Sequence, residues 1–385
     1  MKHFLLMLFV VLWSTVTGQA QLIEGTILDE VSSTGIPYAN IYNKTLDIGT
    51  ISNEDGYFEI RIRSTSDVIE ISFIGYEGQT IPLTKGQRTY TILLQEESQL
   101  LNEVTITPKD DSYLFNLLFE AKKVANFPNQ EAKAYYELKT WRDQKQVELV
   151  ENYYNLLLRG PDVSGFQLKA GRLALQEEEG RYFGSFGGSN AINLLKLWDR
   201  NDFFPNTPID IAKRRAKRTF YLHLSKKYIN ADQDSIYVID YEPQTSDGPY
   251  FTGQIWLNKS DMQVLKITQL CDACAVHPFI PLFPTDSLLS VNFDITKTFK
   301  SIDGKMVFNH IDFLYDVTYR SRIGYNWEDE FTVSTKAVLY AYDFEHQFYI
   351  PSFFLGNKYK GDYRKINGVP YNIFFWDYND EYGLN

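Results

Sequence analysis

A long succession of strand-length segments constrains the fold of this chain more than any other feature. From residue 134 onward, apolar and aromatic residues alternate with polar ones over short stretches separated by turn residues. Hairpin turns are expected at Ser260-Asp261 and at Ser301 to Gly304. Consecutive long hairpins predict a curved antiparallel sheet, shaped like a half-barrel, over residues 131–345. The expected strands are 134–141, 146–158, 165–175, 219–224, 235–241, 251–258, 263–270, 289–299, 305–319 and 330–340.

A second, shorter set of strands precedes this region. Glycine-containing turns separate these strands, and Asp55-Gly56 predicts a turn with a left-handed residue. The spacing predicts a small antiparallel β-sandwich over residues 21–108. Its expected strands are 22–28, 38–42, 57–62, 68–73, 80–83 and 90–94.

Four sequence blocks in this segment carry a family resemblance. They are Gly25 to Asp29, Ile36 to Ile41, Gly49 to Phe58 and Ile71 to Tyr76. Together they resemble the carboxypeptidase regulatory-like domain, which implies a transthyretin-like sandwich. The resemblance makes these residues structural, and we expect the domain to be an interaction module.

One helix is expected between the two β regions, as a linker over residues 109–130. Asp111-Ser112 offers an N-cap and Pro128 ends the helix. An apolar stripe on one face predicts packing against the following sheet. The stripe consists of Leu114, Leu117, Leu118, Ala121, Val124 and Ala125.

The two ends of the chain differ in character. Lys2 and His3 precede an apolar run and small residues near position 20, which predicts a signal peptide over residues 1–20; a buried helix is the alternative. The remaining chain has a net charge of −12, because Lys2 is the only charge removed from a total of −11. This acidity argues against nucleic acid as a partner. Residues 346–385 are expected to form an irregular tail packed on the β domain.

The later segments also carry resemblances. Residues 101–108 resemble the segment that follows the same domain in TonB-dependent receptors, and the β region resembles lipoprotein-carrier folds, in which a curved sheet lines an apolar cavity. Residues 203–208 and 250–267 make the chain similar to the soluble front part of an uncharacterised outer-membrane family. These resemblances imply an exported protein that is periplasmic or associated with the outer membrane.

Cys271 and Cys274 are the only cysteines in the chain. An exported protein meets an oxidising compartment, so we expect a disulfide. A metal site with His277 is the alternative, although zinc normally takes a fourth ligand. Haem attachment is excluded because Ala275 stands where a histidine is required.

No catalytic motif is recognisable in the sequence. None of the five histidines is followed three residues later by a glutamate, so a zinc peptidase is not supported. Asn53 and Asp55 offer too few oxygen ligands for calcium, and a plain turn is favoured there. We expect no cofactor and no metal.

Two further segments are candidates for function. Residues 184–190 are rich in glycine and predict a mobile loop, which would be a lid through Gly184, Gly187 and Gly188 if the sheet encloses a cavity. A basic run follows an expected helix at 191–198, and it predicts either a contact with anionic lipid or a solvated helix face. Its members are Lys213, Arg214, Arg215, Lys217 and Arg218.

These observations favour a non-enzymatic envelope protein whose curved sheet holds an apolar ligand, with that ligand or an envelope protein as partner. A structural or adhesive protein with a filled core is the alternative, and a hydrolase with an unrecognised site comes third. A retained cavity favours the first function and a packed interior the second. Convergent carboxylates with perturbed pKa values would favour the third.

Overall fold

The computed structural model divides into two compact units, one ending at Glu96 and one running from Glu97 to Asp380. The expected signal peptide and the expected boundary at residue 108 lie outside the described residues. The described ranges are 21–37, 39–46, 48–53, 55–73, 75–96, 111–178, 181–182, 184–229, 234–245, 248–281, 283–323, 327–349 and 361–379.

The first unit contains two sheets, with strand orders β4-β1-β7 and β3-β2-β5-β6. Ile27, Ile41 and Ile69 are fully buried in its core. Gly56 has a φ of +80°, as the expected turn requires. One pairing differs from the expected antiparallel arrangement, because β7 arrives from the other sheet and pairs parallel to β1. The strands are β1 (Gln21–Asp29), β2 (Asn40–Asn43), β3 (Ile48–Ile51), β4 (Tyr57–Ile62), β5 (Ile69–Ser72), β6 (Gln79–Ile81) and β7 (Thr89–Leu94).

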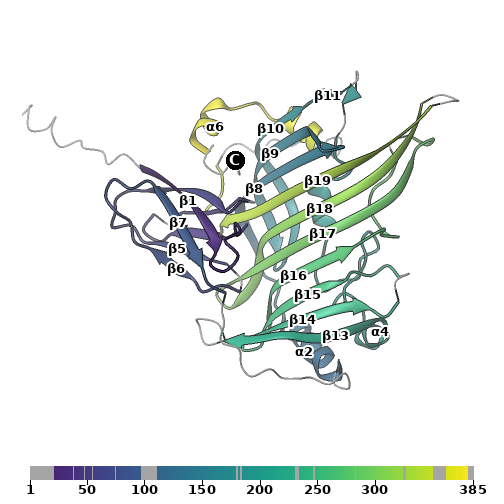
Figure 1. Ribbon diagram of the computed structural model, residues 1–385, viewed down its shortest axis with the longest axis horizontal. Helices are drawn as coiled ribbons and strands as arrows, with labels where there is room; N and C mark the ends of the chain where they lie inside the picture. Colours follow the sequence, from purple (N-terminus) through teal and green to yellow (C-terminus); the bar gives the residue numbers. More distant parts are fainter. Residues whose placement is uncertain are drawn as a thin grey trace, which may run out of the picture. The chain divides into compact units, whose positions relative to one another are not determined.

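The second unit is built on a curved sheet of ten antiparallel strands, shown in Figure 1. The sheet joins two meanders, β8 to β10 and β13 to β19, through the pairing of β8 with β19. This architecture confirms the predicted fold class, a mainly β chain with a sandwich, a helix and a curved sheet. The strands are β8 (Asn129–Arg142), β9 (Lys145–Arg159), β10 (Asp162–Leu175), β13 (Phe220–Ile229), β14 (Ser235–Pro243), β15 (Gly253–Asn258), β16 (Gln263–Cys271), β17 (Ser287–Ile302), β18 (Lys305–Ile323) and β19 (Trp327–Asp343), with a small hairpin of β11 (Glu177–Glu178) and β12 (Arg181–Tyr182).

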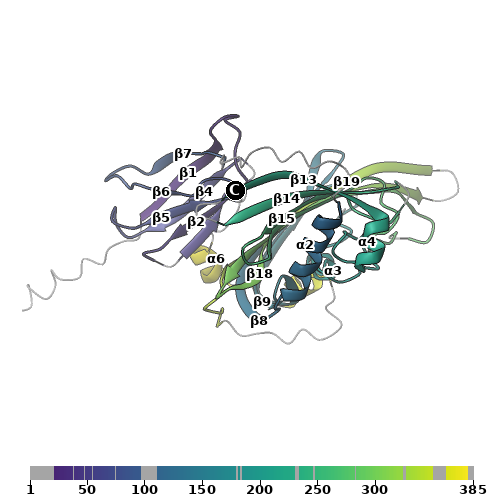
Figure 2. The same ribbon diagram turned by 90° about the horizontal axis from the view of Figure 1, so that it is seen from below.

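Three helices, α2 (Asp111–Val124), α3 (Ser189–Leu194) and α4 (Lys213–Thr219), lie on one side of this sheet, which we call the inner face (Figure 2). Side chains alternate between the two faces along each strand. Those on the inner face form one continuous apolar core with the three helices. None of the described helices has both the length and the apolarity of a membrane span.

Two helix predictions need correction. Val124 was expected on the packed stripe of α2, but it is 60% exposed because the helix ends there. Leu114, Leu117, Leu118 and Ala121 of the stripe are buried. The helix expected at 191–198 ends at Leu194, and Trp198 adopts a left-handed φ of +71°, which no α-helix accommodates.

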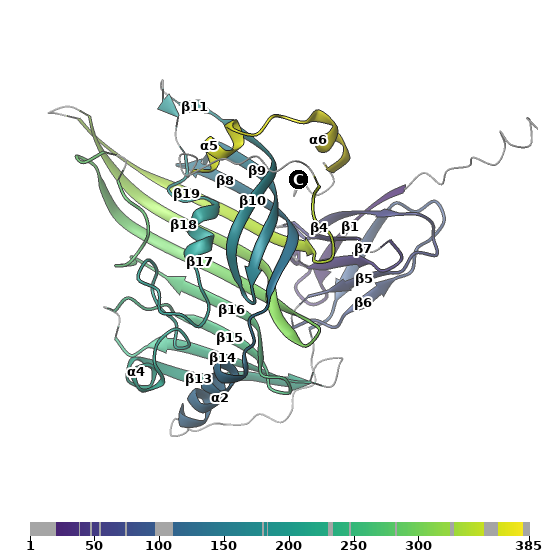
Figure 3. The same cartoon turned by 180° about the vertical axis from the view of Figure 1, so that it is seen from behind.

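The described part of the C-terminal tail contains two helices, α5 (Asp362–Asn367) and α6 (Ile373–Asn379), so the expectation of irregular structure is wrong. Both lie beside β9 and β10 (Figure 3). Ile366 of α5 belongs to the inner core, whereas Phe375 and Trp376 of α6 pack on Tyr153, whose ring is on the opposite face. The tail therefore covers both faces of the sheet next to the edge strand β10.

Candidate functional site

A cavity of about 320 Å³ lies on the inner face of the second unit and opens to solvent. Strands β8 and β9 form its floor, and its walls come from α3, the start of α5 and two loops. Its apolar lining consists of Leu138, Val150, Phe186, Ala191, Leu194, Pro278 and Phe279. Its remaining lining consists of Glu148, Ser185, Gly187, Gly188, Asn190, Gly361, Asp362 and Tyr363.

The glycine-rich loop forms part of the wall of this cavity. Gly187 and Gly188 line it, and Gly184 lies next to the hydroxyl of Tyr363. The hydroxyl of Tyr315 accepts the N–H of Gly187 at 3.0 Å and donates to its carbonyl at 2.9 Å. The centre of the loop is therefore tied to the sheet, and its role as a lid stays a prediction.

Two carboxylates hold the ends of this loop. Glu148 on β9 accepts the N–H of Ser185 at 2.6 Å. Asp362 on α5 accepts the N–H of Ser189 at 2.8 Å and its hydroxyl at 2.6 Å. Because β9 and α5 supply these acceptors, the loop is fastened to two separate elements.

Glu148 is 2% exposed, and its carboxylate also accepts the hydroxyls of Thr140 and Tyr363. Burial raises the pKa of Glu148, while these donors oppose the rise. Glu148 was not among the residues predicted from the sequence. The alternation of side chains along β9 could have indicated it, because Glu148 lies on the same inward-facing side of the strand as Val150 and Tyr154.

A buried hydroxyl lies behind the same wall of the cavity. Tyr136 on β8 is fully buried, and within the described part of the chain its hydroxyl has no hydrogen-bond partner. A Cβ placed on Gly188 would lie 3.7 Å from that hydroxyl and 2.0 Å from Oδ2 of Asp362. Burial, followed by the charge of Asp362, raises the pKa of Tyr136 well above its usual value. Tyr136 therefore stays neutral, with its hydroxyl close to Gly188.

Beyond the cavity, much of the inner face is closely packed. The rings of Phe293 and Phe313 stack with centroids 6.0 Å apart, and Phe279 lies 4.6 Å from Tyr315. Phe204 of the 203–208 segment is fully buried against Phe293. The cavity described above therefore lies beside a closely packed core and is of modest size.

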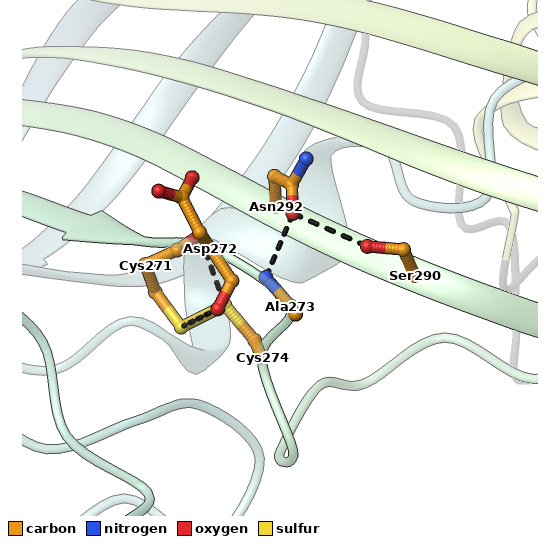
Figure 4. Close-up of a disulfide and its surroundings, with 6 residues drawn as sticks. All are labelled: Cys271, Asp272, Ala273, Cys274, Ser290 and Asn292. Atoms are coloured by element: carbon orange, nitrogen blue, oxygen red, sulfur yellow. Dashed lines mark hydrogen bonds between the residues drawn. A yellow bond between two sulfur atoms is a disulfide. The ribbon is translucent and has the colours of Figure 1, made fainter. Parts of the chain in front are cut away.

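Cys271 and Cys274 are joined by a disulfide in the structure (Figure 4). The turn between them is fastened to β17, because the N–H of Ala273 donates to Asn292 at 2.8 Å and the N–H of Cys274 donates to Val291 at 2.7 Å. His277 instead stacks on Phe279, so the alternative of a three-ligand metal site is not formed. Among the described residues, no group of three potential metal ligands is present.

The basic run forms the exposed side of α4, where Ala216 alone is buried. Lys217 donates to Ser112 at 2.8 Å and Arg215 donates to the hydroxyl of Tyr250 at 3.0 Å. Within the described ranges, none of its five cations is paired with a carboxylate. The exposed helix face is therefore present, and Glu120 on α2 lies near enough for the charge of Lys213 to help lower its pKa.

Comparison with known proteins bears first on the sandwich. The family model of the CarboxypepD_reg-like domain matches residues 23–106. These residues form a carboxypeptidase regulatory-like domain. The side chain of Asn53 in this regulatory-like domain accepts the N–H groups of Asp55 and Tyr57, which is the expected turn.

Two curated proteins share similarity over part of the chain. The TonB-dependent receptor SusC of Bacteroides thetaiotaomicron is 32% identical over 106 residues, which is 26% of this chain and 10% of that protein. The TonB-dependent receptor P39 of Formosa agariphila is 32% identical over 84 residues, which is 22% of this chain and 8% of that protein. The chain spans about a tenth of the length of these relatives.

Solved structures show only distant similarity. A DUF1329 family protein from Desulfovibrio piger has a TM-score of 0.23 and 9% identity, and covers 63% of this chain and 95% of its own. A LolA superfamily protein from Nitrosomonas europaea has a TM-score of 0.21 and 13% identity, and covers 60% of this chain and 93% of its own. Scores this low support no statement about the ligand of this chain.

Proposed function

We propose that this chain is a non-enzymatic binding protein of the bacterial envelope whose inner-face cavity holds an apolar chain or segment. The observation that carries the proposal is the cavity beneath residues 184–188. Its volume of about 320 Å³ is at the lower end of the range of ligand pockets, roughly 300–1,000 Å³. That size fits a single apolar chain better than several.

The envelope location rests on three further observations. The sequence begins with the pattern of a signal peptide, a disulfide joins Cys271 and Cys274, and both curated relatives are TonB-dependent receptors. The regulatory-like domain falls in a compact unit of its own, and we take it to be an interaction module that contacts another envelope protein.

The loop at residues 184–189 is the lid in this proposal. Movement of this loop requires release of Ser185 from Glu148, of Gly187 from Tyr315 and of Ser189 from Asp362, and it would widen the existing mouth of the cavity for the ligand. The same bonds argue against a hydrolase, because the two carboxylates already accept hydrogen bonds that hold the loop.

A structural protein without a ligand remains the second candidate, favoured by the close packing of the remaining inner face. Native mass spectrometry with lipid extraction, on protein purified without detergent, separates the two. We expect a stoichiometric ligand mass. A clean mass of the folded, ligand-free protein supports the structural candidate instead.

A matched pair of variants ties any bound mass to the cavity. Leu194→Phe adds a ring to the cavity lining, whereas Leu173→Phe changes a half-buried leucine of the same core that does not line the cavity. We expect the ligand to be lost only from Leu194→Phe. Equal retention in both variants would place the ligand elsewhere.

We also propose that α4 contacts anionic lipid headgroups. Each exposed cation near such a surface contributes about 1 kcal/mol. Flotation with vesicles containing phosphatidylglycerol should recover the protein at low salt, and Arg214→Glu combined with Arg218→Glu should abolish recovery. The matched control reverses the exposed Lys85 and Arg88, and recovery that ignores the α4 changes contradicts the proposal.

A further inference from the structure

The described residues that line the cavity carry charge of one sign. Among them, Glu148 and Asp362 are the charged ones, and none is a lysine, arginine or histidine. The cation nearest to either, as far as the described residues show, is Lys365, whose ammonium lies 3.7 Å from Asp362 and also donates to Asn190 at 3.3 Å. A ligand in this cavity therefore meets an acidic wall, whose negative charge Lys365 offsets only in part.

The lining combines apolar and polar groups. Leu138 and Val150 form the floor, and Phe186 and Phe279 lie with ring centroids 6.2 Å apart. The charged groups are Glu148, on the same face of β9 as Val150, and Asp362 at the start of α5. A ligand that contacts both kinds of group has an apolar body and a polar end.

The hydroxyl of Tyr136 adds a buried polar group behind this end of the cavity. It is without a partner among the described residues, and a Cβ on Gly188 would lie 3.7 Å from it. Tyr136 is not among the lining residues that the structure describes, so the group that a ligand hydroxyl meets is Asp362, to which it can donate a hydrogen bond. A ligand carboxylate or phosphate would instead face two carboxylates.

We propose, on the basis of the function proposed above, that the cavity selects amphiphiles whose polar end is a hydroxyl or an amine over those that end in a carboxylate or a phosphate. A hydroxyl donates a hydrogen bond to Asp362 and brings no like charge. An ammonium gains attraction to both carboxylates. The anionic ends of free fatty acids and phospholipids are disfavoured for the same electrostatic reason.

Titration calorimetry with three probes of equal chain length tests this selection. The probes are 1-decanol, decylamine and decanoate, all below their aggregation limits at pH 7.4. Chains of about ten carbons suit the volume, since an apolar cavity of about 150 Å³ already holds a benzene molecule. We expect 1:1 binding of the alcohol and the amine, with decanoate at least about tenfold weaker.

Asp362→Asn is the informative variant, because its remaining oxygen still accepts from Ser189. We expect the ratio of the decanol affinity to the decanoate affinity to fall several-fold in this variant. Asp316→Asn, on the exposed outer face of β18, should leave the ratio unchanged and controls for net charge.

The two proposals fail in different ways. Decanoate that binds as tightly as decanol overturns the head-group selection and leaves the cavity function intact. Absence of binding by all three probes, together with a clean ligand-free mass, overturns both proposals.

Discussion

The carboxylate of Glu148 accepts the backbone N–H of Ser185 at 2.6 Å and so fastens the loop over the cavity to the sheet. The same carboxylate accepts the hydroxyls of Thr140 and Tyr363. One buried side chain thus contacts Thr140 on the neighbouring strand β8, the loop, and helix α5 of the C-terminal tail.

Replacing Glu148 with alanine leaves these donors without their acceptor. Each buried donor left unsatisfied costs about 1–3 kcal/mol, so we expect Glu148→Ala to lower the free energy of unfolding by about 3 kcal/mol or more. Urea denaturation measures this change. Glu345→Ala, at an exposed glutamate, should stay within about 0.5 kcal/mol of the parent protein. Equal stability of both variants would show that Glu148 does not support the loop.

The titration of buried Asp210 should make the free energy of unfolding depend on pH. Burial raises its pKa to about 6, against the hydrogen bonds from Thr207 that lower it. Between pH 4 and 6 the folded chain keeps a proton that the unfolded chain releases, so this group makes stability fall as pH rises, by on the order of 3 kcal/mol in total. Below this window both states are protonated, and above it both are ionised.

Asp210→Asn should remove that contribution. Denaturation curves from pH 3.5 to 7 should show a smaller decline between pH 4 and 6 in the variant than in the parent protein. Asp199→Asn, at an exposed neighbouring carboxylate, is the control. An unchanged profile for Asp210→Asn would mean that this carboxyl titrates normally in the folded chain.

Two aromatic residues of helix α6 should differ in how much their replacement destabilises the protein. Trp376 is 3% exposed and lies under Arg172, whose guanidinium carbon is 4.3 Å from the ring centroid, whereas Phe374 is 81% exposed. We expect Trp376→Ala to cost about 3–5 kcal/mol and to open residues 361–379 to protease. Phe374→Ala should change stability by less than about 0.5 kcal/mol. Equal proteolysis of both variants would contradict the packing of this helix.

The disulfide predicts a modest response to reductant. It closes a loop of about four residues, for which the chain-entropy treatment gives about 2 kcal/mol. Reduction should lower the free energy of unfolding by about that amount, and the double variant Cys271→Ser, Cys274→Ser should no longer respond. Two free thiols in the untreated protein, detected by mass shift after alkylation, would contradict the pairing.

The sequence by itself determined the local structure of this chain. Apolar side chains at every second position predicted ten strands, because alternate side chains of a strand share one face. The Asp55-Gly56 turn and the stripe of α2 from Leu114 to Ala121 are equally local. Strand ends were less well predicted, since Asn129 to Lys133 extend β8 through pairing with β9.

Only the tertiary structure decided the cavity and its polar groups. Glu148 and Tyr363 are 215 residues apart in the chain, and no local pattern indicates that β9 and α5 meet. The pairing of β8 with β19 likewise joins the two meanders by long-range hydrogen bonds, and the tail packs on both faces of β10 through contacts that chain folding brings together. Periodicity reports which side of an element is buried, whereas the partner on that side depends on the whole chain.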